Sequence, residues 1–342
     1  MTLSRRELNR ALLARQGLLD RFPPDLPDAL RRIGGIQAQY APAMYLGLWS
    51  RLADLERDAV TRALEDRSAI QATLLRSTIH LVAAGDFWPW AVAVRAARRE
   101  GFLRGRPDAP PAAAMARAAR RLRSRLAAGP MLRRDIEALL GKDAARGVGL
   151  WLDLVRVPPL GTWERRRADL YGLAEDWLAP VAISKTEAVE HVVSSYLSGF
   201  GPAPPGDVAN WAGLKITDVR RAVARMELRR LRGPDGEELL DLPDAPLPAA
   251  DTPAPPRFLP VWDATLLVHA RRTQILPEEL RPRVFSIRLP HGVSTFLVDG
   301  AVAGAWRLQD GRVELEPFVR LDAADRRALE AEAERLAAFA AD

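Results

Sequence analysis

Residues 213–242, GLKITDVRRAVARMELRRLRGPDGEELLDL, decide the fold of this chain. The first four residues predict a turn, and Thr217 is typical of the residue that caps a helix, here one that extends to about Leu228. Two strands are expected next, at 228–231 and 238–242, and the GPDG between them is a strong turn signal. A helix followed by such a hairpin is typical of the second half of a winged-helix unit.

The same order of elements occurs three times along the chain. In the third copy, two further helices are expected upstream, over 186–197 and 206–212. The first copy has expected helices at 26–33, 42–52 and 58–65, then strands at 70–75 and 78–82. The second has expected helices at 112–127, 132–140 and 146–154, then strands at 155–157 and 168–173. We therefore predict three tandem winged-helix units, with domains at 1–95, 96–180 and 181–245.

The C-terminal part of the sequence has a different character. A Pro- and Ala-rich linker at 243–256 precedes alternating segments typical of strands. These segments are expected near 257–268, 284–289, 293–298, 301–308 and 313–318, before a closing helix at 323–340. We predict a small β-rich, barrel-like domain over 257–342, and for the whole chain a mainly helical α+β fold.

Composition favours a nucleic-acid partner and excludes several classes of site. The 342 residues carry 50 basic side chains, of which 47 are arginine (50 − 3 lysines), and a formal net charge of +6. Arginine suits phosphate recognition, although the codon bias of a GC-rich genome also explains much of its preference over lysine. The absence of cysteine excludes disulfides, zinc fingers and iron–sulfur clusters.

No cofactor, metal or membrane association is expected from the sequence. Histidines are not grouped with carboxylates at metal-ligand spacing, and no phosphate-binding glycine loop or nucleophile elbow occurs. The N-terminus lacks the apolar segment of a signal peptide, and no run of eighteen apolar residues exists. We expect a cytoplasmic monomer.

Two short motifs are candidates for function. Trp163 lies beside Arg165, Arg166 and Arg167 in the expected second hairpin, where arginines could contact phosphates or pair with neighbouring acidic residues. In the extended Gln37-Ala38-Gln39, both carboxamides would lie on one side of the chain. Taken alone, such glutamines more often cap helices or bind backbone.

Five stretches, in order and spacing, resemble one family: 15–19, 35–39, 48–51, 76–82 and 259–263. The chain is similar over nearly its whole length to the AlkZ-like winged-helix DNA glycosylases, which include azinomycin-resistance enzymes and relatives that unhook crosslinked N7-alkylguanine. The resemblance implies a concave basic surface and assigns Gln37 and Gln39 to the catalytic motif. It also implies that His80, Tyr40 and Thr78 line the site. The residues expected to contact DNA are Arg51, Arg76, Trp163, Arg165, Arg166, Arg167 and Arg271.

This chemistry suits a carboxamide pair. N7-alkylated guanine is already cationic and leaves readily, so the enzyme only has to position water and stabilise an oxocarbenium-like sugar. The expected partner is double-stranded DNA containing alkylated guanine, and the expected product is an uncleaved abasic site.

Two alternative functions stay open. A transcription regulator would bind a palindromic site as a dimer, although no heptad seam is present. An interaction scaffold would not bind DNA even at low salt.

Overall fold

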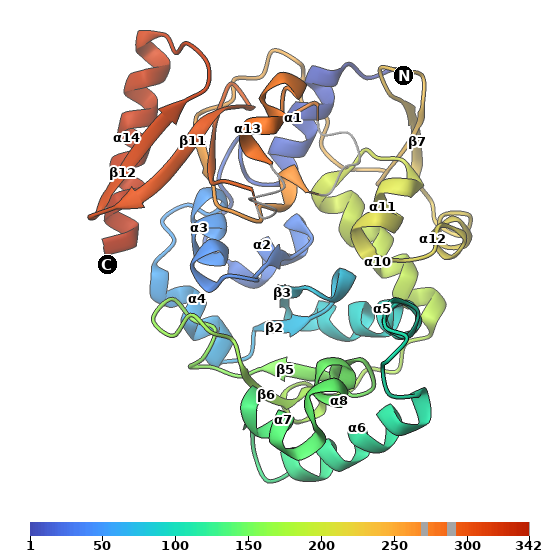
Figure 1. Ribbon diagram of the computed structural model, residues 1–342. Coiled ribbons are helices and arrows are strands. Elements are labelled where there is room, and N and C mark those ends of the chain that lie inside the picture. Colours follow the sequence, from blue (N-terminus) through green and yellow to red (C-terminus); the bar gives the residue numbers. More distant parts are fainter. Residues whose placement is uncertain (268–272, 286–291, 342) are drawn as a thin grey trace.

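The computed structural model describes residues 1–267, 273–285 and 292–341. Three copies of one order of elements follow one another (Figure 1): a helix, a short strand or bridge, two helices and a two-stranded hairpin. The first copy is preceded by α1 (Arg5–Arg15) and consists of α2 (Leu26–Ile33), β1 (Ile36–Gln37), α3 (Ala41–Arg51), α4 (Arg57–Glu65), β2 (Ala69–Thr73), the one-turn η1 (Leu75–Ser77) and β3 (Ile79–Ala83).

The second copy consists of α6 (Ala112–Leu126), β4 (Met131–Leu132), α7 (Arg133–Leu140), α8 (Lys142–Gly147), η2 (Val148–Leu150), β5 (Leu154–Arg156) and β6 (Leu170–Leu173). The helix expected at 146–154 is wrong, because α8 begins directly after Gly141 and its last turn tightens into η2. The left-handed φ of Gly141, 79°, breaks the chain between α7 and α8. The helical segment therefore ends at Leu150, and β5 begins at Leu154.

The third copy consists of α10 (Lys185–Phe200), α11 (Pro205–Ala212), α12 (Ile216–Val223), β7 (Arg229–Arg232) and β8 (Glu238–Asp241). A capping box between Ser184 and Glu187 fixes the start of α10. Gly213, at φ 69°, ends α11 in the left-handed conformation. The helix expected to reach Leu228 ends five residues earlier, in tighter turns such as Arg225 N–H to Ala222 O at 2.9 Å.

The first two copies share one six-stranded sheet, of order β1-β3-β2-β5-β6-β4. Antiparallel pairing of β2 with β5, Gln71 opposite Arg156 and Ala72 opposite Val155, joins the two hairpins edge to edge. In the third copy, an isolated bridge of Ala203 to Leu240 extends the β7–β8 hairpin in the same way that β1 extends β3. All three copies thus place the segment before the helix pair beside the last strand of the hairpin.

A long helix, α5 (Ala84–Gly105), connects the first copy to the second and packs against α10. Pro89 lies inside this helix, in its second turn. Because proline has no N–H, the backbone oxygen of Gly85, four residues earlier, lacks its helical hydrogen bond. Trp90 of α5 lies 5.2 Å from the ring of Trp211 in α11, so one buried core spans the copies.

The C-terminal part contains β9 (Arg257–Leu259), β10 (Thr295–Val298), β11 (Ala301–Gln309), β12 (Arg312–Pro317) and α14 (Ala323–Ala341). Their order, β12-β11-β10-β9, is an open sheet within the described residues, so the expected barrel is not confirmed. The strand expected at 257–268 stops at Leu259, because Pro260 and η3 (Ala264–Leu266) follow. Of the segment at 284–289, Val284 ends α13 (Arg281–Val284) and residues 286–289 lie outside the described ranges. The remaining short helices are α9 (Ala174–Trp177) and η4 (Glu278–Leu280).

Two buried ion pairs tie distant segments together. Arg15 contacts Asp241 at 2.6 Å, and Arg51 contacts Asp263 at 2.9 Å, with all four side chains almost fully buried. Each pair joins the N-terminal part of the chain to a residue more than 200 positions later. Among the helices of the described ranges, none has the length and apolar character needed to span a bilayer.

Candidate active site

A pair of glycines positions the glutamine motif. Gly34 and Gly35 both adopt left-handed φ, 72° and 67°, where α2 ends and β1 begins. A Cβ on Gly35 would lie 3.0–3.1 Å from Val82, Leu81 and Trp90. Only glycine fits here without strain, and this tight turn sets β1 directly beside β3.

Gln37 faces His80 across the β1–β3 pair. Directly opposed residues of antiparallel strands have Cβ atoms about 4.5–5.5 Å apart. Gln37 is 7% exposed, and no hydrogen bond joins its carboxamide to another described residue. A nearly buried amide without a partner among the described residues is suited to hold a water molecule or a ligand.

Gln39 is anchored by the same strand. Its Oε1 accepts a hydrogen bond from the backbone N–H of Ile79 at 2.9 Å. Because that N–H can only donate, the carbonyl oxygen faces β3 and the NH₂ group points elsewhere. Ala38, between the glutamines, is buried in the core beside α3, and its N–H bonds to Ile79 O at 2.8 Å. Of the two glutamines, Gln39 therefore binds backbone, through one lone pair of its carbonyl oxygen.

His80 is held neutral beside the glutamines. Its ring is buried, and Nδ1 lies 3.1 Å from the backbone oxygen of Thr78, so Nδ1 carries the proton. Burial lowers the pKa of His80 to about 3, with smaller contributions from Arg76 and Arg98. Nε2 is therefore an acceptor at neutral pH, but too weak a base to remove a proton from water.

The turn between β2 and β3 connects this site to the third copy. Arg76 and Ser77 adopt left-handed φ, 48° and 61°, and Thr78 Oγ1 bonds to Leu75 O at 3.0 Å. The guanidinium of Arg76 donates to the backbone oxygen of Trp211, at the end of α11. Arg76, expected to contact DNA, is therefore partly engaged within the protein and partly exposed.

Tyr40 links the glutamine motif to the arginine-rich loop between β5 and β6. It is 41% exposed, and its hydroxyl lies 3.1 Å from Nη1 of Arg166. Arg165 and Arg167 are also exposed, and Arg167 approaches Asp169 at 3.5 Å. The structure thus brings this loop to the residue adjoining Gln39, which the spacing in sequence does not indicate.

Three of the residues expected to contact DNA are not found on an exposed surface of the described structure. Trp163 is partly buried and packs against the core, with its ring 5.7 Å from Tyr45 and 6.2 Å from Phe339. Arg51 is 1% exposed and bonds to Asp263, so its predicted DNA contact is wrong. Arg271 lies outside the described residues.

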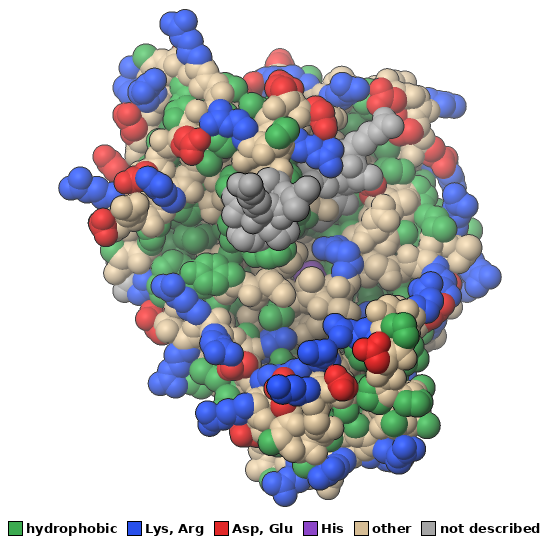
Figure 2. Space-filling model, in the orientation of Figure 1, with side chains coloured by type: hydrophobic (Ala, Val, Ile, Leu, Met, Phe, Trp, Pro, Cys, Tyr) green, Lys and Arg blue, Asp and Glu red, His purple; other side chains and the backbone are tan. Residues whose placement is uncertain are grey.

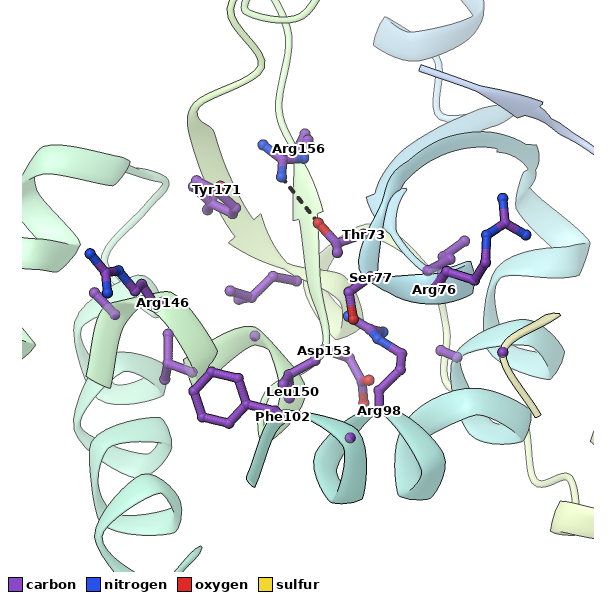
Figure 3. A pocket seen from close by; sticks show the side chains of 18 of the residues that line it. Thr73, Arg76, Ser77, Arg98, Phe102, Arg146, Leu150, Asp153, Arg156 and Tyr171 are labelled. Carbon is purple, nitrogen blue, oxygen red and sulfur yellow. Dashed lines mark hydrogen bonds between the residues drawn. The ribbon is translucent and has the colours of Figure 1, made fainter. Parts of the chain in front are cut away.

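The sequence reading missed a cluster of arginines beside the site. A cavity of about 620 Å³ lies between α5, the β2–β3 turn and the second copy. Figure 3 shows Arg98 of α5 reaching toward Ser77 beside Asp153, with Arg156 and Tyr171 higher on the wall. These residues come from segments that the pairing of β2 with β5 and the contacts of α5 with η1 and η2 bring together, and no local motif marks them.

The surface around the site is positively charged. Figure 2 shows Lys and Arg side chains along the lower side of a hollow in the middle of one face, where a histidine side chain is visible. Within the described ranges, no group of three or more His, Asp or Glu side chains could hold a metal ion.

Comparisons with known proteins agree with this arrangement. The family model AlkZ-like, described as DNA glycosylase AlkZ-like, matches residues 30–339. The solved structure of Streptomyces sahachiroi DNA glycosylase AlkZ is similar with a TM-score of 0.82, over 100% of this chain and 98% of that chain, at 21% sequence identity. No curated protein sequence matches the chain. The structural similarity shows a shared fold from end to end.

Proposed function

The chain belongs to the AlkZ-like DNA glycosylase family and is a DNA glycosylase, and we propose that it hydrolyses the N-glycosidic bond of N7-alkylguanine in duplex DNA. The observation that carries the proposal is the carboxamide of Gln37. It is nearly buried, faces a neutral histidine, and within the described residues makes no hydrogen bond. Such a group is available to orient a water molecule.

The two glutamines have different roles in this proposal. Gln37 accepts a hydrogen bond from the attacking water, and its carbonyl dipole faces the positive charge that develops on the sugar. Gln39, whose Oε1 is held by Ile79 N–H, keeps one lone pair for the same water or sugar. His80 Nε2 lies on the same face of the sheet and adds a third uncharged acceptor.

The absence of a strong base among these groups fits a cationic leaving group. A carboxamide and a histidine with a pKa of about 3 cannot deprotonate water before the bond breaks. N7-alkylated guanine leaves without protonation, so orientation and electrostatic stabilisation suffice. An unalkylated base would need an acid or base that these residues do not supply.

We further propose that the enzyme is monofunctional. A lyase step needs an amine to form a Schiff base with the sugar. The three lysines are Lys142, Lys185 and Lys215, all outside the first copy. Lys185 and Lys215 are bound to Asp218 and Glu100 at 2.8 Å. The product is therefore an intact abasic site.

The three repeated copies support a winged-helix interpretation, with domains at 1–95, 96–180, 181–245 and 257–342. Each hairpin is preceded by a helix pair and is extended by the segment before that pair. We propose that the hollow in Figure 2 holds the duplex, with Arg165, Arg166 and Arg167 contacting phosphates. Bulky adducts and interstrand crosslinks are proposed substrates, in repair or in self-resistance to a DNA-alkylating natural product. The enzyme acts as a cytoplasmic monomer in this proposal.

Matched duplexes test the substrate. One strand carries a single N7-methylguanine, and controls carry guanine or hypoxanthine at the same position. We expect release of N7-methylguanine and an uncleaved strand until hot alkali is added. Tight binding of a palindromic site by a dimer, with no release from any duplex, would instead indicate a regulator.

A further inference from the structure

The arginine-lined cavity beside the glutamine site has a strong imbalance of charge. Six arginines and one aspartate are among its lining residues, a formal balance of +5 (6 − 1). The arginines are Arg76, Arg98, Arg106, Arg133, Arg146 and Arg156. A volume of about 620 Å³ is within the range typical of small-ligand sites, roughly 300–1,000 Å³.

Arg98 is the guanidinium without a partner. Within the described residues it forms no hydrogen bond or ion pair, and its Nε is fully buried. The nearby carboxylate of Asp153 is bound instead to Arg95, at 2.7 Å. Burial is the main reason that the pKa of Arg98 is lowered to about 10, so it stays charged at neutral pH. The charge of Asp153 acts on Arg98 from nearby and offsets part of the cost of burying it, but no carboxylate in the described residues bonds to its guanidinium, and an anionic ligand would offset the rest.

The opposite wall adds a second cation and a ring. Arg156 donates to Thr73 Oγ1 at 3.0 Å and to the backbone oxygen of Ala168, but its Nε has no partner in the described ranges. Its guanidinium lies 4.8 Å from the ring of Tyr171. Phe102 contributes apolar surface, with Arg106 stacked over it at 5.9 Å. Cations beside aromatic rings suit the phosphate and base of a nucleotide.

We infer that this cavity binds a phosphate ester of a nucleotide unit, with Arg98 as its principal counter-ion. Guanidinium groups match phosphate oxygens in pairs, and the lining offers several from different directions. The ester comes either from the backbone of bound DNA or from a free nucleotide. Binding of a DNA backbone phosphate rests on the proposed glycosylase function, whereas binding of a free nucleotide does not.

The cavity adjoins the turn and strand that hold the glutamine motif. Ser77 lines it, and two residues later the N–H of Ile79 holds Gln39. Two residues span at most about 7 Å. A strand whose phosphate is held at Arg98 would therefore be anchored on the same β2–β3 turn that positions the glutamines.

Arg98→Met tests the inference, with Arg134→Met as the matched control. Arg134 is on α7, its side chain is 80% exposed, and it does not line the cavity, so both variants lose one charge. The first arm measures binding of an undamaged duplex by fluorescence anisotropy from 50 to 300 mM salt. The second arm measures binding of dGMP and of inorganic phosphate by calorimetry at constant ionic strength.

If the cavity holds a phosphate of the DNA backbone, Arg98→Met should lower the slope of log affinity against log salt by about 1, while Arg134→Met should not. If the cavity holds a free nucleotide, the wild type should bind dGMP and Arg98→Met should weaken this binding at least tenfold, with the slope for the duplex unchanged. An unchanged slope together with undiminished or absent dGMP binding would overturn the inference. Neither arm uses base release, so failure of the glycosylase proposal would be seen separately.

Folding of the variants is controlled in two ways. Removing an unpaired buried cation should leave the midpoint of thermal unfolding unchanged or raise it. Arg106 is exposed at the rim of the cavity, so Arg106→Met should fold normally and show the same loss in whichever arm responds. If Arg98→Met does not fold and Arg106→Met matches the Arg134→Met control in both arms, the inference is wrong.

Discussion

Gln37 lies directly opposite His80 across the β1–β3 pair, and His80 is neutral because burial lowers its pKa to about 3. An amide without a partner in the described residues and an uncharged imidazole therefore share one face of the sheet. This pairing gives the site acceptors without negative charge. In the proposed function this favours substrates whose leaving group is already cationic, and the burial of His80 has measurable consequences for stability.

His80 makes the protein sensitive to acid. Its pKa is lower in the folded state, about 3, than in the unfolded state, about 6.5, so the unfolded chain binds more protons between these values. Stability is therefore complete above pH 6.5 and falls as the pH decreases toward 3, by up to about 1.4 kcal/mol per unit. Urea unfolding at pH 7, 6 and 5 should show this slope.

The control for that slope is a variant without the imidazole. His80→Gln should flatten the pH dependence of the free energy of unfolding, because the glutamine side chain takes up no proton in this pH range. Equal slopes in wild type and His80→Gln would show that His80 is not the buried neutral group described here.

Arg51 is expected to contribute to stability and not to DNA binding. Arg51→Ala leaves the carboxylate of Asp263 buried and uncompensated, which typically costs about 3–5 kcal/mol. Urea unfolding measures this loss. Arg62→Ala is the control, since Arg62 pairs with Glu56 on the surface and its loss should change stability little. A stable Arg51→Ala variant with reduced DNA affinity would contradict the assignment.

Local signals in the sequence predicted the helices and turns of the repeated copies well, because helix caps and turns depend on neighbouring residues. The capping box at Ser184 and the glycine at 213 fix α10, α11 and their turn within a few residues. The pairing of β2 with β5 has no such signal, because it joins residues more than 80 positions apart. The predicted units at 1–95 and 96–180 therefore did not include the sheet that the first two copies share.

The same limit applies to the site. The order Gln37-Ala38-Gln39 and its resemblance to a family predicted that the glutamines belong to the site. The DNA contact predicted for Arg51 does not fit its buried ion pair, whose partner Asp263 lies 212 residues away and has no local signal. Arg98 was overlooked because an arginine in an Ala- and Arg-rich helix has no distinguishing context until the fold surrounds it.

Gly35 is expected to be essential to the position of β1. Gly35→Ala places a Cβ 3.0–3.1 Å from three neighbours at a left-handed φ. We expect a loss of stability of at least about 1–2 kcal/mol, together with slower base release. Gly85→Ala is the matched control, because nothing lies within 4 Å of its Cβ position, at the start of α5. Both free energies of unfolding are read from urea curves.

The arginine-rich loop is expected to contribute to the salt dependence of DNA binding. Replacing Arg165, Arg166 and Arg167 together by alanine should reduce the slope of log affinity against log salt by up to about 3. The matched control replaces Arg117, Arg120 and Arg121, three exposed arginines of α6. If the two triple variants behave alike, net charge alone accounts for the effect and the loop makes no specific contact.

Single-turnover release of N7-methylguanine by wild type and Gln37→Ala tests the central claim most directly, with duplex affinity measured in parallel. We predict that the rate falls at least about 100-fold, as on removal of a transition-state hydrogen-bonding group, while affinity and unfolding free energy stay unchanged. Gln71→Ala, on a neighbouring strand but outside the motif, should keep its rate when folded. A Gln37→Ala enzyme that releases the base at the wild-type rate would contradict the account.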